Sequence, residues 1–127
     1  MTQAIVLSQE APAPGGAYSQ AVLSGQVLAL SGQVGVDPTI GKTPEGVAAQ
    51  TWQVLANLET VLAAAGAKPE EVIKATCFLV NIDDFPVFNE EYGVFFGDQR
   101  PARSTIGMAL FGGYPVEVEA LAVIPEN

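Results

Sequence analysis

Arg103 and Glu117 are the two charged residues whose surroundings could support chemistry. Arg103 follows Arg100-Pro101-Ala102 and enters a run of small and apolar residues that is typical of a strand. A planar guanidinium in such a place can bind a carboxylate through two parallel hydrogen bonds. An arginine exposed on an edge strand would give the same pattern, so Arg103 alone leaves both interpretations open.

Glu117 lies near the start of the last apolar run, after the turn at Gly112–Pro115. If this turn lets the two final strands pair, Glu117 lies in the same region of the sheet as Arg103. A carboxylate near an arginine on an apolar face is either a structural ion pair or an acid–base partner. Glu119 shares the face of Glu117, because side chains alternate along a strand, and could be its solvated neighbour.

Tyr18 and the segment Ser31-Gly32-Gln33 are further candidates. Tyr18 follows Gly15-Gly16-Ala17, whose glycines let the loop approach another surface closely. Its hydroxyl could serve a site, or its ring could cap the core. Ser31-Gly32-Gln33 ends an apolar strand, where backbone groups could face a ligand, although an ordinary exit from a strand looks the same.

Composition excludes several classes of chemistry. The 127 residues include no histidine and one cysteine, Cys77, which lies in an apolar run and is expected in the core. Histidine catalysis, nearly all catalytic zinc sites, cysteine-rich metal sites and an internal disulfide are therefore excluded, and no metal site is predicted. The net charge is -9 and the five basic residues form no stripe, so nucleic acid is not an expected partner.

The sequence also predicts neither a membrane span nor a leader segment. No apolar run approaches the roughly 20 residues of a membrane-spanning helix. The N-terminal residues lack the basic region and the long apolar core of a signal peptide. We therefore expect a cytoplasmic protein.

The elements that must position these residues alternate between strands and helices. A helix is predicted from an N-cap at Thr43 to Gly66, because apolar residues recur at i, i+3 and i+4. A second helix, capped by Asp83 or Asp84 and ended by Gly97, carries an aromatic stripe expected in the core. This order predicts one α+β domain over residues 1–127, a mixed sheet with two helices on one face. The predicted strands are Ile5–Leu7, Tyr18–Leu23, Gln26–Ser31, Val72–Val80, Ala102–Leu110 and Val116–Ile124.

The sheet face away from the helices is predicted to be only half polar. In the last strand, Glu117 and Glu119 are followed on the same face by Leu121 and Val123, and Phe78 lies on this face of another strand. Such a face is most simply buried against other copies of the chain, with the glutamates at a rim or a cleft.

Several blocks of the sequence resemble the Rid/YjgF-like family of reactive-intermediate deaminases. The similarity has matching spacing and spans nearly the whole chain. Its most specific blocks are Pro101-Ala102-Arg103-Ser104-Thr105 and Val116-Glu117-Val118-Glu119-Ala120-Leu121-Ala122. The others are Gly16-Ala17-Tyr18-Ser19-Gln20-Ala21, Leu30-Ser31-Gly32-Gln33, Gln50 with Asn57-Leu58, Ala65-Gly66 and Phe88-Asn89-Glu90-Glu91-Tyr92.

The resemblance implies a chorismate-mutase-like fold, assembled as a homotrimer around a central sheet barrel with clefts between subunits. It also implies hydrolysis of small 2-imino and enamine acids, such as 2-iminopropanoate and 2-aminoacrylate, to 2-keto acids and ammonia without a cofactor. By position, Arg103 matches the family's carboxylate-binding arginine, Glu117 the glutamate associated with the water, and Tyr18 the tyrosine of the cleft. The positions that line or support the cleft are matched by Thr105, Ser31, Gly32 and Asn89.

The sequence departs from the family pattern at several positions. Ala17 and Gly35 replace frequent prolines, Thr105 stands where cysteine is frequent, and Ala109–Tyr114 is atypical, which leaves the side chain of the substrate open. Three alternative functions also stay open. They are a non-catalytic trimer that binds carboxylates, an endoribonuclease or translation inhibitor, as the family is often labelled, and a holdase-like protein with exposed apolar surface.

Overall fold

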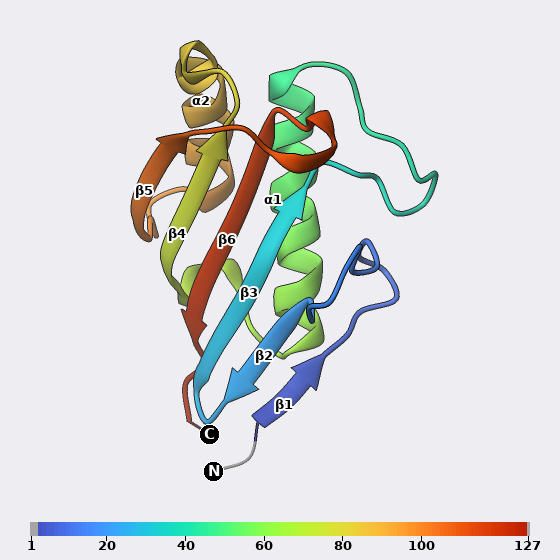
Figure 1. Cartoon of the computed structure of the whole chain (residues 1–127). Coiled ribbons are helices and arrows are strands. Elements are labelled where there is room, and N and C mark those ends of the chain that lie inside the picture. The colour runs from blue at the N-terminus through green and yellow to red at the C-terminus, as the bar shows by residue number, and fades with distance from the viewer. Residues whose placement is uncertain (1–2, 127) are drawn as a thin grey trace.

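The computed structural model describes residues 3–126, which form one six-stranded sheet with two helices packed on one face (Figure 1). The strand order is β1-β2-β3-β6-β4-β5, in which β4 and β5 are parallel and the other neighbours are antiparallel. The predicted α+β arrangement of a mixed sheet with two helices is confirmed. The strands are β1 (Gln3–Val6), β2 (Ala21–Ser24), β3 (Val27–Val34), β4 (Val72–Leu79), β5 (Ala102–Gly107) and β6 (Val116–Val123). The helices are α1 (Val47–Ala64) and α2 (Phe85–Phe96), with short 3-10 turns η1 (Pro69–Glu71), η2 (Ile82–Asp84) and η3 (Phe111–Gly113).

The strand that carries Arg103 does not pair with the strand that carries Glu117. β5 lies at the edge of the sheet beside β4, and β6 lies on the other side of β4. The prediction that the two final strands pair is therefore wrong. Its physical reason is the crossover through α2, which returns the chain parallel to β4 and so places β5 next to it.

The helix α1 begins later than predicted. It starts at Val47, because Gly46 has a φ of 90° that no helical residue adopts. The N-cap predicted at Thr43 is therefore wrong, since a glycine turn separates it from the helix. The predicted end is confirmed: Gly66 has a φ of 78°, and the N–H of Ala67 donates to the carbonyl of Leu62 at 2.8 Å.

The helix α2 carries the predicted aromatic stripe into the core. Phe88, Tyr92 and Phe96 are buried, with ring centroids 5.6 Å apart for the first pair and 4.7 Å for the second. Asp84 precedes the helix as predicted, although its side chain caps no backbone N–H, and Gly97 ends the helix with a φ of 61°. The helix α2 lies behind β4 and β5, the edge of the sheet that carries Arg103 (Figure 1).

A buried amide joins α1 to the segment that follows β3. The side-chain nitrogen of Asn57 donates to the carbonyls of Val34 and Val36 at 3.0 and 2.9 Å, and its oxygen accepts from Gln53 at 2.9 Å. Asn57 is almost completely buried, so these bonds replace water that the carbonyls would otherwise bind. The network fixes the end of β3 against the helix layer.

The opposite face of the sheet remains half apolar in the single chain. Side chains that pair across β3, β6, β4 and β5 on this face include Val27, Leu121, Val123, Phe78 and Ile106. Val27, Leu121, Val123 and Ile106 are exposed, with exposed fractions of 36% to 49%. Within residues 3–126, no helix has the length and apolar composition needed to cross a membrane.

We expect Asn57→Ala to lower the free energy of unfolding by about 2 kcal/mol, because two carbonyls and one amide lose their partner in the interior. Urea unfolding followed by circular dichroism measures the change. Glu59→Ala, at an exposed position of the same helix, should change it by less than about 0.5 kcal/mol. Equal losses in the two variants would contradict the role of the network.

Candidate functional site

A groove of about 1030 Å³ lies beside the end of β3. Its walls come from the loop between β1 and β2, the end of β3 with the segment after it, the loop between β5 and β6, and β6 itself, which flank β3 in Figure 1. Four of the seven predicted site residues line this groove: Tyr18, Ser31, Gly32 and Glu117. The fold therefore brings together candidates from three separate parts of the sequence.

Gly32 and Glu117 pack closely against each other in the groove. The register of β3 against β6 shifts between Leu30 and Gln33, so Ser31 and Gly32 form a bulge. A Cβ atom on Gly32 would lie 2.8 Å from Cδ of Glu117 and would overlap one of its carboxylate oxygens. Glycine at this position therefore makes room for the Glu117 carboxylate over the bulge.

The surroundings of Glu117 favour its protonated form. Partial burial raises the pKa of Glu117, and the neighbouring negative charge of Glu119 raises it further. A carboxylate with a raised pKa accepts a proton more readily than an exposed glutamate does, as a general base requires. The stability that this proton contributes is present below the unfolded pKa and is lost as the pH rises through the higher folded pKa.

The loop that carries Tyr18 is fixed by a buried glutamine. The side-chain oxygen of Gln20 accepts from the N–H of Ser8 at 2.6 Å, and its nitrogen donates to the carbonyls of Ser8 and Pro12 at 3.2 and 2.8 Å. Gln20 is 1% exposed. The sequence analysis assigned no role to Gln20. Its position within the family block Gly16–Ala21 is the one sequence feature that points to it.

Tyr18 and Ser31 are joined through the same loop. The hydroxyl of Ser31 donates to the carbonyl of Ser19 at 2.6 Å, which ties β3 to the loop. The hydroxyl of Tyr18 accepts from the N–H of Gly15 at 3.0 Å, while half of the side chain stays exposed. The hydroxyl can therefore still donate to a ligand in the groove.

Arg103 lies outside the groove, on the other face of the sheet. Its neighbour across the parallel ladder is Ala75, whose partner in β6 is Ala120, and both are buried under the helices. Glu117 pairs with Phe78 on the face away from the helices. The prediction that Arg103 and Glu117 lie in one region of the sheet is therefore wrong within a single copy of the chain.

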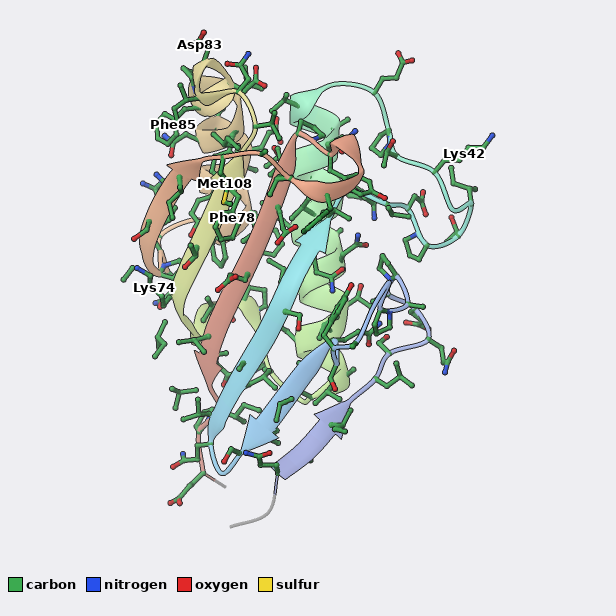
Figure 2. All side chains as sticks on the ribbon, in the orientation of Figure 1. Lys42, Lys74, Phe78, Asp83, Phe85 and Met108 are labelled. Carbon is green, nitrogen blue, oxygen red and sulfur yellow. The ribbon has the colours of Figure 1, made fainter. Side chains whose placement is uncertain are left out.

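Three aromatic rings of α2 hold the guanidinium of Arg103. Its central carbon lies 4.6 Å from the ring centroid of Tyr92, 5.5 Å from that of Phe85 and 5.9 Å from that of Phe88. Figure 2 labels Phe85 at the start of α2. The ring faces attract the cation without using its N–H donors. The half-buried side chain is therefore restrained while its donors stay available to a carboxylate.

Two other predicted residues lie on the same side of the sheet as Arg103. Thr105 is half-buried and points to the same face of β5, because it lies two residues further along the strand. Asn89 is exposed on α2, four residues after Phe85 and three before Tyr92, which makes it a neighbour of both on the helix surface. The seven predicted residues thus form two groups. The groove residues are Tyr18, Ser31, Gly32 and Glu117, and the Arg103 edge consists of Arg103, Thr105 and Asn89.

Cys77, Lys74 and Lys42 belong to neither of these two groups. Cys77 is buried, and its burial raises the pKa of the thiol to about 12, so it is no thiolate at neutral pH. Lys74 donates to the hydroxyl of Ser104 at 3.0 Å, and Lys42 extends from the loop after β3, away from the sheet (Figure 2). Residues 3–126 contain no cluster of histidine, cysteine, aspartate and glutamate suited to a metal ion.

Comparison with known proteins assigns this chain to a family. The sequence profile of the family described as endoribonuclease L-PSP matches residues 8–124. The chain belongs to this family. This match, together with relatives named as deaminases and as RidA, confirms the resemblance to Rid/YjgF-like proteins.

Relatives of this L-PSP family chain carry different names. The 2-iminobutanoate/2-iminopropanoate deaminase of Rattus norvegicus is 43% identical over 94% of this chain and 88% of its own. A RutC family protein of Pyrococcus horikoshii is 38% identical over 93% of this chain and 95% of its own. The crystal structure of RidA from an Antarctic Psychrobacter superposes with a TM-score of 0.92, at 36% identity, over 95% of this chain and 99% of that one. Curated deaminases are thus among its relatives, beside proteins named only by family.

We expect Glu119→Gln to lower the pKa of Glu117, because it removes the neighbouring negative charge. Carboxyl carbon shifts followed by NMR across a pH titration measure the change. Glu59→Gln, on the helix α1, is the matched control and should leave the Glu117 titration unchanged. A Glu117 pKa that stays constant or rises in Glu119→Gln would contradict the coupling.

Two substitutions of Tyr92 distinguish how its ring and its hydroxyl contribute to the free energy of unfolding. Among the described residues, the buried Tyr92 hydroxyl has no hydrogen-bond partner. Tyr92→Phe should therefore leave the free energy of unfolding unchanged or raise it by up to about 1 kcal/mol. Tyr92→Leu, which removes the ring under Arg103, should lower it by about 2 kcal/mol. Urea unfolding of both variants tests this, and a large loss in Tyr92→Phe would mean that the hydroxyl has a partner.

Proposed function

We propose that this L-PSP family protein hydrolyses small 2-imino acids to 2-keto acids and ammonia, in sites formed between the copies of a homotrimer. One observation carries the proposal. Arg103 is suited to bind a carboxylate and Glu117 is suited to accept a proton, but the two side chains lie on opposite faces of the sheet in one chain. Neither group alone can bind and hydrolyse an imino acid. A second copy that brings its Arg103 edge to the groove would complete the site.

The half-apolar sheet face supports such an assembly. Val27, Leu121 and Val123 lie together on it and would gain from burial against another copy. Head-to-tail contacts join two different surfaces of one chain, and a ring closes when the rotation allows it. This is the kind of interface that two separate half-sites require.

The proposed mechanism follows from the two groups. Arg103 of one copy binds the carboxylate of the substrate with two hydrogen bonds and so fixes the C=N carbon in the groove of the next copy. Glu117 takes a proton from a water, whose oxygen attacks that carbon to give a carbinolamine. The substrate reacts as the iminium, whose nitrogen already carries an extra proton. Glu117 passes the water's proton to this nitrogen, and the C–N bond breaks as Glu117 takes the proton of the carbinolamine hydroxyl. The products are the 2-keto acid and ammonia, which receives this last proton.

The other predicted residues have supporting parts in this scheme. Tyr18 and Ser31 offer hydroxyl groups beside Glu117, and Gly32 leaves space for its carboxylate. Thr105 and Asn89 would line the cleft from the copy that supplies Arg103. The scheme requires no cofactor or metal ion, since the iminium is itself electrophilic, and it is compatible with the cytoplasmic location expected from the sequence.

Charge distinguishes this proposal from the nuclease function in the family's name. Glu117 and Glu119 line the groove of a chain whose net charge is -9. They would repel a polyphosphate backbone, which proteins usually bind with clustered lysine and arginine. A single arginine suits a small monocarboxylate better than an RNA strand. Nucleic acid and membranes are therefore not among the proposed partners.

Single variants test the roles of the two charged residues. A pyridoxal-phosphate dehydratase generates 2-iminopropanoate from serine, and trapping with semicarbazide measures how fast the imine disappears. Glu117→Gln should lower kcat by about 100-fold, because it removes the proton acceptor. Arg103→Ala should raise KM strongly, with Arg103→Lys intermediate because it keeps charge without the planar pair of donors. If Arg103→Ala hydrolyses the imine as the wild type does, the deaminase proposal fails.

Mixed assemblies test whether the site lies between copies. Arg103→Ala and Glu117→Gln chains are co-expressed in equal amounts, and the product is compared with each variant alone. Because half of the copies supply each intact residue, about one quarter of the interfaces would hold both. Activity near that fraction of the wild type is therefore expected. A mixture as inactive as its two parents, with mixed assembly verified by mass spectrometry, would place both residues in one chain's site.

A further inference from the structure

The loop between β5 and β6 presents an aromatic side chain at the groove. Phe111 lies in the turn η3, is 98% exposed, and lines the same groove as Glu117. Tyr114 follows in the same loop, lines the groove too, and is half-buried. Two aromatic rings of this loop therefore border the space in which the reacting carbon would lie.

The conformation of this loop depends on two consecutive glycines. Gly112 and Gly113 have φ values of 75° and 73°, which other residues rarely adopt. A Cβ atom on Gly112 would lie 2.6 Å from a ring carbon of Tyr114, so the ring of Tyr114 rests directly on the glycine backbone. The glycines thus turn the chain, and the loop leaves Phe111 exposed while the ring of Tyr114 packs against Gly112.

The remaining lining of the groove includes both polar and apolar residues. The polar residues include Glu117, Ser31 and Gln33, whereas the segment after β3 contributes Val36 and Pro38. A 2-imino acid has its carboxylate and its C=N carbon at one end, where Arg103 and Glu117 would act. Its side chain is then left to the apolar residues, together with Phe111 and Tyr114.

We infer that Phe111 and Tyr114 make this protein selective for 2-imino acids with a bulky apolar side chain, such as those derived from phenylalanine and leucine. This inference rests on the proposed function and names its substrate class. A ring that is almost fully exposed in a single copy gains burial when the apolar side chain of a substrate contacts it. A small substrate such as 2-iminopropanoate offers too little apolar surface for that gain.

The test compares two imines in two variants. L-amino acid oxidase generates the imino acids of phenylalanine and alanine, and trapping with semicarbazide gives kcat/KM for each. The wild type should prefer the phenylalanine-derived imine, and Phe111→Ala should lower kcat/KM for it by about tenfold while changing the alanine-derived imine by less than about twofold. Trp52→Ala, which removes an exposed aromatic ring of α1 outside the groove, is the matched control and should change neither.

Three results would overturn the inference. They are a wild type that prefers the alanine-derived imine, equal losses on both imines in Phe111→Ala, and loss of the assembly in that variant by sedimentation, which would place the ring in an interface. Calorimetric binding of phenylpyruvate and pyruvate separates this inference from the proposed function. A protein inactive on every imine that still binds phenylpyruvate more tightly, and loses that preference in Phe111→Ala, would refute the deaminase proposal and retain the aromatic selectivity.

Discussion

Side chains alternate between the two faces of a β-sheet, and in this protein α1 and α2 cover only one of those faces. This alternation fixes where each candidate residue can act. Arg103 shares its face with the buried residues under α2, whereas Glu117 shares its face with the uncovered side chains of β6. A single chain therefore cannot bring the two together by a change of rotamer. The separation makes assembly a condition of the proposed chemistry.

Each half of the site is held by neighbours that do no chemistry themselves. The Arg103 guanidinium rests on the ring of Tyr92, and the Glu117 carboxylate occupies the space that Gly32 leaves open. Gln20, buried behind the loop of Tyr18, fixes that loop through three hydrogen bonds to the backbone. Such restraint lowers the entropy that is lost when a substrate binds, which matters in a protein without histidine that relies on positioning.

The electrostatics of the groove oppose the stability of the folded chain. Burial and Glu119 both raise the pKa of Glu117, so the ionised form that would act as a base is the form that folding disfavours. Functional residues are often placed at such a cost to stability. The packing of α2 and the buried Asn57 network lie elsewhere in the fold and can offset that cost.

The sequence by itself determined the α+β class, the two helices on one face, the aromatic core of α2 and the glycine that ends α1, because each depends on local periodicity or on one residue's backbone freedom. It also supplied the candidate residues, through its resemblance to a family whose profile matches residues 8–124. Only the tertiary structure decided that β5 returns beside β4, that Arg103 and Glu117 face opposite ways, and that Gln20 fixes the Tyr18 loop. Strand order and facing arise from contacts between residues far apart in the chain, and no local pattern of residues records them.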